Sequence, residues 1–274
     1  MTDGMPESWC GVDFMNVASG PFIMGSPVDD DHVDDDEKPR HVLDIPYDYW
    51  MGKTPVTNDA FRAFVSDTSY ETSAERAGWA WVWNVAEQGW QEEEGADWQH
   101  PLGPHSGLDG LEHHPVVSVS FHDARAYCEW LTMQAPPGLP EGYHFRLPGE
   151  AEWEKTARGP DGRVWPWGDR FDPTFCNSGE DEPHAAVAVG TYSPRADSYY
   201  GVSDMSGNIW EWTTTLWGNE RYVARSCTRT GSATGATTRR RMTVSIGSFA
   251  AARSRTTGRH SGQPVATWTL PTSP

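Results

Sequence analysis

The sequence predicts an irregular, loop-dominated fold in which short strands and a few helices are anchored by aromatic side chains. Its 274 residues include 27 Gly and 21 Pro, which interrupt regular elements. They also include 15 Trp, which can fix loops to a core. Long apolar runs are few. The length suits one large domain or two small ones and is sufficient for a substantial core.

Short apolar or alternating segments predict the strands. Residues 21–26 predict a short strand that closes at a Gly-Ser turn. Residues 41–45 alternate polar with apolar side chains and predict a second strand, which residues 47–53 continue into a turn. Residues 113–120 predict a further strand.

Apolar residues at helical spacing predict three helices. The first opens in residues 57–65, where Thr57 or Asn58 can serve as its cap. The second covers residues 120–131 and is amphipathic. The third covers residues 148–159, with Pro at its start, acidic residues in its first turns and Gly at its end.

Residues 70–110 form a Trp-rich stretch among Gly and Glu. We expect a long ordered insertion that is pinned by its aromatic side chains. These indoles either line a groove or close a core beneath a loop, and the sequence leaves both interpretations open. The tryptophans concerned are Trp79, Trp81, Trp83, Trp90 and Trp98.

Charge and cysteine usage limit the partners and the compartment. The formal net charge of −18 argues against nucleic acid or an anionic membrane as a partner. The first seven residues lack a basic, apolar leader, and no window approaches a membrane span. Cys10, Cys128, Cys176 and Cys227 form no CxxC pair, which indicates a reducing compartment, and we expect a cytoplasmic protein. Cys128 falls on an apolar helix face, which favours an inert buried thiol.

Several polar groups have both a functional and a structural interpretation. The acidic residues within 29–37 could bind a cation, but they lack the alternating spacing of a calcium loop, which favours a solvated loop. His113 and His114 are adjacent on an extended segment and would point to opposite faces, which favours structural roles over a shared metal. Glu150 and Glu154 lie one helical turn apart. They could act as a general acid and base, or they could compensate the positive end of the helix dipole and pair with nearby basic residues.

Seven motifs occur along the chain: Gly20 to Gly25, Pro55 to Asn58 with Phe61, Gly95 to Pro101, His114 to Val117 with Ala126 to Cys128, Arg146 to Glu154, Trp167 to Asp169, and Gly207 to Trp212. In this order and spacing, they closely resemble the formylglycine-generating enzyme, or sulfatase-modifying factor, family. The resemblance covers roughly residues 17 to 217. It implies a single irregular α+β domain, distantly similar to C-type lectins, with bound calcium.

The resemblance also implies two calcium sites. The first would use the side chains of Asp204 and Glu211 and the carbonyl groups of Gly207 and Ile209. Asp204 replaces an Asn that is frequent in the family, a change that an oxygen-seeking ion tolerates. The second would use Asn177 and the carbonyl group of Ser178. Its other ligands fall in a shortened loop, where Asp181 is a candidate by proximity alone.

The best-known relatives use oxygen and a copper ion held by two cysteines to oxidise a sulfatase cysteine to formylglycine. Those cysteines follow a Gly-Gly-Ser-aromatic motif, which this chain lacks. Cys227 stands alone in unrelated sequence, so no catalytic or copper-binding residue is assigned. A sulfatase or another peptide substrate is the partner that the resemblance implies.

The sequence divides into an N-terminal extension (1–16), the family-like domain (17–220) and a basic tail (221–274). The tail contains nine Arg and no Lys, Asp or Glu, and a third of it is Ser or Thr. No helical or strand period persists in it. A disordered tail or a nucleic-acid-binding arm would have this composition. A third interpretation fits better, namely that the tail is translated out of frame and is poorly ordered.

The genetic code supports the frameshift hypothesis. Codons built from the third base of one residue and the first two bases of the next can spell D-G-V-Y-R-V-V-R-G-G-S-F across residues 242–254. This is the Arg-Gly-Gly-Ser-aromatic motif of the family. In the shifted frame, neither copper-ligand position can encode Cys, so the ancestor was a relative without that oxidase chemistry. The junction would lie between roughly residues 216 and 230, and sequencing the gene tests it.

Three functional hypotheses follow. The first is a member of the family that is not competent for cysteine oxidation. The second is a calcium-stabilised, non-catalytic module whose Trp-rich groove binds a peptide or a small ligand. The third, an accessory domain of iron-dependent sulfoxide synthases, is disfavoured because the His-rich helical bundle that precedes such domains is absent from this sequence.

Overall fold

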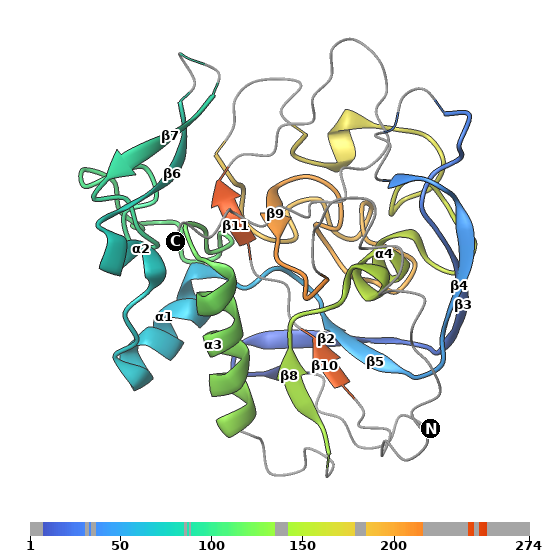
Figure 1. Cartoon of the computed structure of the whole chain (residues 1–274), viewed down its shortest axis with the longest axis horizontal. Helices are drawn as coiled ribbons and strands as arrows, with labels where there is room; N and C mark the ends of the chain where they lie inside the picture. Colours follow the sequence, from blue (N-terminus) through green and yellow to red (C-terminus); the bar gives the residue numbers. More distant parts are fainter. Residues whose placement is uncertain are drawn as a thin grey trace.

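A computed structural model shows a mixed α+β domain of small sheets, few helices and many loops (Figure 1). It describes residues 8–30, 33, 37–84, 87, 89–134, 142–178, 185–215, 241–243 and 247–250. In this part of the chain, no helix is both long and apolar enough to cross a membrane.

A five-stranded sheet forms the base of the domain (Figure 1). Its strand order is β1-β2-β5-β10-β8. The first three strands pair antiparallel, whereas β10 runs parallel to both of its neighbours, β5 and β8. The bounds are β1 (Ser8–Trp9), β2 (Val12–Val17), β5 (Tyr49–Gly52), β10 (Arg241–Thr243) and β8 (His144–Arg146).

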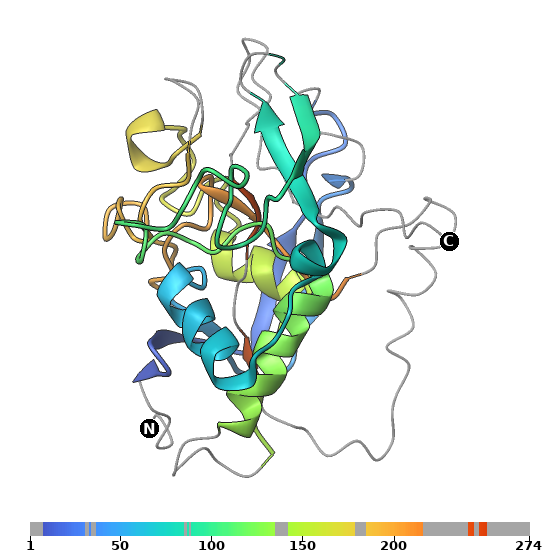
Figure 2. The same cartoon turned by 90° about the vertical axis from the view of Figure 1, so that its left-hand side faces the viewer.

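Three antiparallel pairs of strands surround this sheet. β3 (Gly20–Met24) pairs with β4 (His41–Ile45) at one edge of the molecule, next to helix α4. β9 (Ile209–Glu211) pairs with β11 (Gly247–Ala250). The third pair, β6 (Trp79–Asn84) and β7 (Gly89–Glu94), is a hairpin that projects from the body of the domain (Figure 2).

Local capping sets the starts of the helices. Thr57 caps α1 (Asn58–Thr68) by accepting the amide of Ala60, and Ser120 caps α3 (Phe121–Met133) through a capping box. The short α2 (Ser73–Ala77) also has a capping box. α4 (Glu150–Arg158) and a 3-10 turn, Pro173–Phe175, complete the helical elements that are described.

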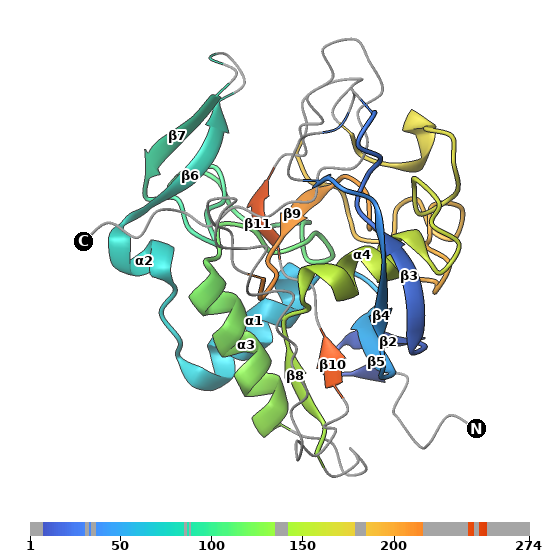
Figure 3. The same cartoon turned by 45° about the vertical axis from the view of Figure 1, so that its right-hand side comes forward.

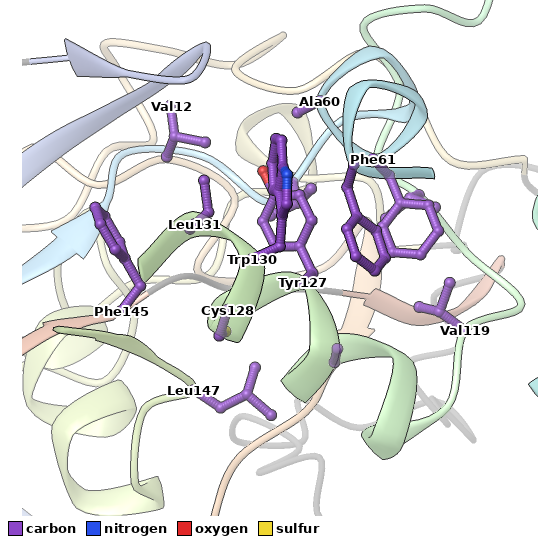
Figure 4. Close-up of a cluster of buried hydrophobic side chains, with 14 of the residues drawn as sticks. Val12, Ala60, Phe61, Val119, Tyr127, Cys128, Trp130, Leu131, Phe145 and Leu147 are labelled. Carbon is purple, nitrogen blue, oxygen red and sulfur yellow. The ribbon is translucent and has the colours of Figure 1, made fainter. Parts of the chain in front are cut away.

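The main core lies between α1, α3 and the large sheet (Figure 4). Phe61 of α1 packs against Trp98 and Tyr127, with ring centroids 5.3 and 5.9 Å apart. Phe14 of β2 meets Phe145 of β8 at 5.6 Å. These aromatic pairs bury large apolar areas and join segments that are distant in the sequence.

Helix α4 joins the large sheet to the β3–β4 pair through buried polar side chains. Glu152 forms an ion pair with Arg146, and its carbonyl accepts the hydroxyl proton of Tyr49. Lys155, only 1% exposed, donates to the carbonyl groups of Ala18 and Gly20 at 2.7 and 2.8 Å. Because buried charges are costly when unpaired, these bonds fix the position of α4.

Most predicted elements form where the sequence places them. β3, β4, α1 and α3 confirm their predictions within a few residues. The third helix begins at Glu150 rather than at Pro148, with Gly149 as its cap. The strand predicted over residues 113–120 is wrong: the segment makes only an isolated bridge between Thr57 and Pro115.

Two ends of the chain contribute more to the sheet than their sequences indicate. The expected N-terminal extension supplies β1 and β2, whose Val12 and Phe14 are buried in the main core. Within the basic tail, β10 and β11 are described, and β10 lies between β5 and β8. The remaining tail, including Cys227, lies outside the described residues.

Candidate metal centre

The segment from Asp204 to Glu211 owes its shape to three residues with left-handed backbone conformation. Asp204, Gly207 and Asn208 have φ values of 57°, 81° and 67°. Two of them are Asp and Asn, the non-glycine residues that tolerate this region best. The result is a compact loop that leads into β9, instead of an extended strand.

This loop lies directly against the other predicted calcium-binding segment. The amide of Asn208 donates to the carbonyl of Asn177 at 3.0 Å. A Cβ atom at Gly207 would lie 2.7 Å from the same carbonyl oxygen. Only glycine therefore allows this close approach, which joins the residues of the two expected sites at one place in the fold.

Asn208 fastens a third segment to the loop. Its side chain is buried, and its Oδ1 accepts the amide of Val187 at 2.9 Å while its Nδ2 donates to the Val187 carbonyl at 3.2 Å. Asn177 donates in turn to the carbonyl of Ala185. Three stretches of irregular chain are thus held together by paired backbone and amide groups.

Asp204 places a partly buried carboxylate in the loop with little compensation. Its Oδ2 accepts the amide of Gly190 at 2.7 Å. Burial raises the pKa of Asp204 to about 6, this amide lowers it, and Asp197 adds a smaller increase by repulsion. A carboxylate in this environment gains from a nearby cation.

Glu211 lies at the end of β9, 6% exposed. Its Oε2 accepts the indole N–H of Trp153 from α4 at 2.5 Å. Ile209, two residues earlier on the same strand, is also buried. This placement ties the loop to α4 and orients one carboxylate oxygen.

The donor set of this region is chemically suited to calcium. Carboxylate, amide and backbone carbonyl oxygens are the ligands that Ca²⁺ prefers. In the described part of the chain, no three His, Cys, Asp or Glu side chains converge on one point, so any site here depends largely on carbonyl oxygens. Ser178 is buried beside Asn177, whereas Asp181 lies outside the described residues.

The described cysteines do not fit a copper–thiolate site. Cys10, Cys128 and Cys176 are free and come from three separate parts of the chain. Burial raises the pKa of the thiols of Cys10 and Cys128, whereas a metal-binding cysteine must lose its proton. Cys128 is an inert core side chain, as its position on the apolar helix face predicted.

Among the other polar candidates, the side chain of Glu154 has structural partners. Glu154 pairs with Arg158 at 2.7 Å and accepts the amide of Gly25 at the same distance, so it stabilises α4 and the β3 turn. The carbonyl of His113 accepts the amide of Val189. Burial lowers the pKa of His114, which disfavours its charged form.

Two residues that support the candidate site, Trp153 and Asn208, belong to recognisable motifs, but the sequence does not reveal what they bind. Trp153 donates to Glu211, and Asn208 links the loop to the backbone of Val187. These partners lie 58 and 21 residues away along the chain, a separation that no local pattern reveals.

The fold and the oxygen-rich loop define an irregular α+β domain of the sulfatase-modifying type. The sequence profile described as "Sulfatase-modifying factor enzyme 1-like domain" matches residues 9–267. The chain therefore belongs to the formylglycine-generating enzyme, or sulfatase-modifying factor, family. The matched range extends beyond the 17–217 that the motifs alone suggested.

Individual relatives support this membership. The "Inactive C-alpha-formylglycine-generating enzyme 2" of Mus musculus is 33% identical over 262 residues, covering 85% of this chain and 80% of the relative. The "Formylglycine-generating enzyme" of Thermomonospora curvata is 31% identical over 238 residues, covering 77% and 73%. The solved structure of PvdO from Pseudomonas aeruginosa shares the fold, with a TM-score of 0.58, 22% identity and coverage of 80% and 77%.

Proposed function

We propose that this protein is a formylglycine-generating-enzyme-like domain that does not oxidise cysteine and that binds calcium through its 204–211 loop. The absence of cysteine oxidation is supported by the burial and the placement of the cysteine thiols. Cys128 is fully buried in the core with a raised pKa, and Cys10 and Cys176 lie on other segments. The similarity to relatives named inactive supports the same conclusion.

A direct assay tests the loss of oxidase chemistry. Purified protein is incubated with copper, oxygen and a Cys-X-Pro-X-Arg peptide, and the thiol content of the peptide is followed. We expect no catalysed loss of thiol above a control with Cys128→Ser. Turnover that requires the protein and copper would overturn the proposal.

The calcium proposal rests on the convergence of Asn177 with the 204–211 loop and on the partly buried carboxylate of Asp204. Bound Ca²⁺ would supply the positive charge that compensates this carboxylate. Asp204, Glu211 and the carbonyl groups of Gly207 and Ile209 would hold one ion, and Asn177 and Ser178 would hold part of a second. The ion would thereby stabilise a region that contains little regular structure.

Titration calorimetry and thermal unfolding test calcium binding. We expect Ca²⁺ to raise the melting temperature of the EDTA-treated protein and Mg²⁺ to do so less, because an irregular loop of carbonyl groups suits the longer Ca²⁺–oxygen bonds. Glu211→Gln should reduce the shift, and Asp204→Asn, which keeps an oxygen ligand but loses the charge, should reduce it less. Asp109→Asn, at an exposed carboxylate, is the control. Equal shifts in all four proteins would contradict the assignment.

A second candidate function is peptide binding by the Trp-rich insertion. The exposure of these tryptophans differs from one to the next. Trp98 is buried in the core, whereas Trp79, Trp81 and Trp83 are partly exposed and Trp90 is exposed on the β6–β7 hairpin. A peptide that is retained without turnover in the assay above would favour this function.

A further inference from the structure

We propose that one face of the β6–β7 hairpin binds a basic segment of a partner protein that presents Arg or Lys at alternating positions. This inference specifies the ligand of the peptide-binding candidate above. We call the surface the Trp–Glu face. It consists of Trp79, Trp81, Trp83, Trp90, Glu92 and Glu94.

The register of the hairpin places these residues on one side. Trp79 pairs with Glu94, Trp81 with Glu92, and Trp83 with Trp90. Directly opposed residues of an antiparallel pair point to the same side, and so do alternate residues of one strand. The four tryptophans and the two carboxylates therefore share a single surface, on which each carboxylate of β7 lies opposite a tryptophan of β6.

The opposite side of the hairpin is the one that packs against the domain. Ala80 and Val82 are buried and join Ala74 and Ala96 in a small apolar cluster. Glu93, on this inner side, accepts a hydrogen bond from Gln91. The domain thus covers the inner side, and the hairpin projects from the body in each view (Figures 1, 2 and 3).

The indoles of the Trp–Glu face form two perpendicular pairs. The ring centroids of Trp79 and Trp81 are 5.8 Å apart at 84°, and those of Trp83 and Trp90 are 5.4 Å apart at 78°. Trp90 is 38% exposed although it is a large apolar side chain. Exposed indoles bind cationic groups over their ring faces and are common at the centres of protein interfaces.

The two carboxylates determine the charge of the ligand. Glu92 and Glu94 are exposed, and neither has a hydrogen-bond or ion-pair partner within the described residues. They are two residues apart on one strand, which separates them by about 7 Å, the spacing of alternate side chains in an extended peptide. With a net charge of −18, the protein also attracts basic segments over longer distances.

Binding of a labelled peptide tests the inference. The probe is a fluorescein-labelled Gly-(Arg-Thr)4 peptide, and Gly-(Gln-Thr)4 is the neutral control. Fluorescence polarisation is measured with the full-length protein at low and at physiological salt. We expect the Arg peptide to bind about tenfold more tightly than the Gln peptide, with a difference that shrinks as salt rises.

Matched variants identify the surface. Glu92→Gln/Glu94→Gln and, separately, Trp81→Leu should each weaken binding of the Arg peptide roughly threefold to tenfold. Glu71→Gln/Glu129→Gln removes two exposed carboxylates elsewhere and should change binding less than about twofold. Circular dichroism establishes that the variants are folded. Equal weakening by both charge variants would overturn the inference, as would equal binding of the two peptides.

A third variant tests the basic tail as a competing occupant. Arg253→Gln/Arg255→Gln/Arg259→Gln removes its last three arginines. If the wild-type protein binds the Arg peptide and this variant binds it equally, the site serves an external partner. If only the variant binds, the chain's own tail occupies the face, and the proposal of an external partner is wrong. These comparisons use neither the oxidase assay nor the calcium measurements. If the peptide does not bind, the proposals on cysteine oxidation and calcium binding are therefore unaffected.

Discussion

Asp204 shows how a single partly buried carboxylate can couple stability to pH. Its folded pKa of about 6 exceeds the ordinary value of 3.8. The protonated form is therefore favoured by folding, and stability is lost as pH rises from about 4 through 6. Without calcium, we expect the wild-type protein to lose about 1–3 kcal/mol over this interval through Asp204.

The variant Asp204→Asn isolates this contribution. It keeps an oxygen that can accept the Gly190 amide but cannot ionise. In urea unfolding with EDTA, the variant should be more stable than wild type above pH 6 and similar to it below pH 4. With saturating calcium, the order should reverse if the ion binds Asp204. A constant difference at all pH values would refute the assignment of this titration.

Gly207 provides a residue-scale test of the junction between the loop and Asn177. Gly207→Ala forces a left-handed alanine and a 2.7 Å contact with the Asn177 carbonyl. We expect a loss of about 2–4 kcal/mol in unfolding free energy. Gly110→Ala is the matched control, since its φ is +78° and no atom lies within 4 Å of the added methyl. Its cost should be about 1 kcal/mol, and equal costs would show that the close contact is unimportant.

At this scale, the sequence proposes residues for the candidate site but does not reveal their contacts. Gly207, Asn208 and Glu211 form a recognisable motif, and their residue types suit an oxygen-binding loop. The partners Trp153 and Val187 come from other segments, and only tertiary packing brings them close. Local patterns therefore predict which groups are present and not which atoms they bind.

Helices α2 and α3 depend on a shared carboxylate, that of Asp123. It is 0% exposed and accepts from the amide of Ser120 at 2.7 Å, from the amide of Ser73 at 3.0 Å and from the hydroxyl of Tyr70 at 3.0 Å. It therefore completes the cap of α3 and fixes the start of α2 to it.

Asp123→Asn should weaken the attachment of α2 to α3. The amide nitrogen would face N–H donors that now bond to a carboxylate, so buried donors would lose their acceptor. We expect a loss of about 2–4 kcal/mol in urea unfolding. Asp59→Asn, at an exposed ion pair with Arg62 on α1, should cost less than about 0.5 kcal/mol. Similar costs for the two variants would contradict a joint capping role.

The sequence predicted α1 and α3 correctly because a local cap residue sets the start of each helix. Thr57 and Ser120 are cap residues that precede amphipathic segments, and both helices begin after them. The strand prediction for residues 113–120 was wrong because this apolar segment packs as irregular chain. Val116 bonds to Val56, and Ser118 adopts a φ of 57°, which interrupts an extended strand. β-propensity alone does not show whether a pairing partner exists.

At the scale of the whole molecule, the sheets are completed by two strands near the C-terminal end of the sequence. β10 lies between β5 and β8 and pairs with both, and β11 pairs with β9, which carries Glu211. A chain that ends at Thr215 lacks both strands and should lose cooperative unfolding, as measured by circular dichroism in urea. A chain that ends at Ala250 keeps both and should unfold cooperatively. Equal unfolding midpoints would show that these strands do not contribute.

The frameshift hypothesis remains a prediction at this scale. Restoring the shifted frame would replace residues 242–254 by the Arg-Gly-Gly-Ser-aromatic sequence at the position of β10 and β11. We expect the restored protein to be more stable than the present one in urea. Gene sequencing decides the question independently: an unbroken coding sequence whose shifted frame lacks this motif would exclude the hypothesis.

The family and the irregular α+β architecture were predictable because several motifs occur in order. The sheet was not. Its interior strand β10 has only three residues, Arg241 to Thr243, in a Ser/Thr- and Arg-rich segment without strand period. A strand of this length is specified by the backbone groups of β5 and β8, and not by its own pattern.

The position of β10 also has a consequence for synthesis. The neighbours β5 and β8 are translated long before the strand that joins them, and they pair with it and not with each other. On the ribosome, a nascent chain can form its helices and its hairpins but cannot close the large sheet until residues 241–243 emerge. During that interval, the edges of β5 and β8 that later pair with β10 lack this partner, and strand edges of this kind are the ones with which other chains can pair.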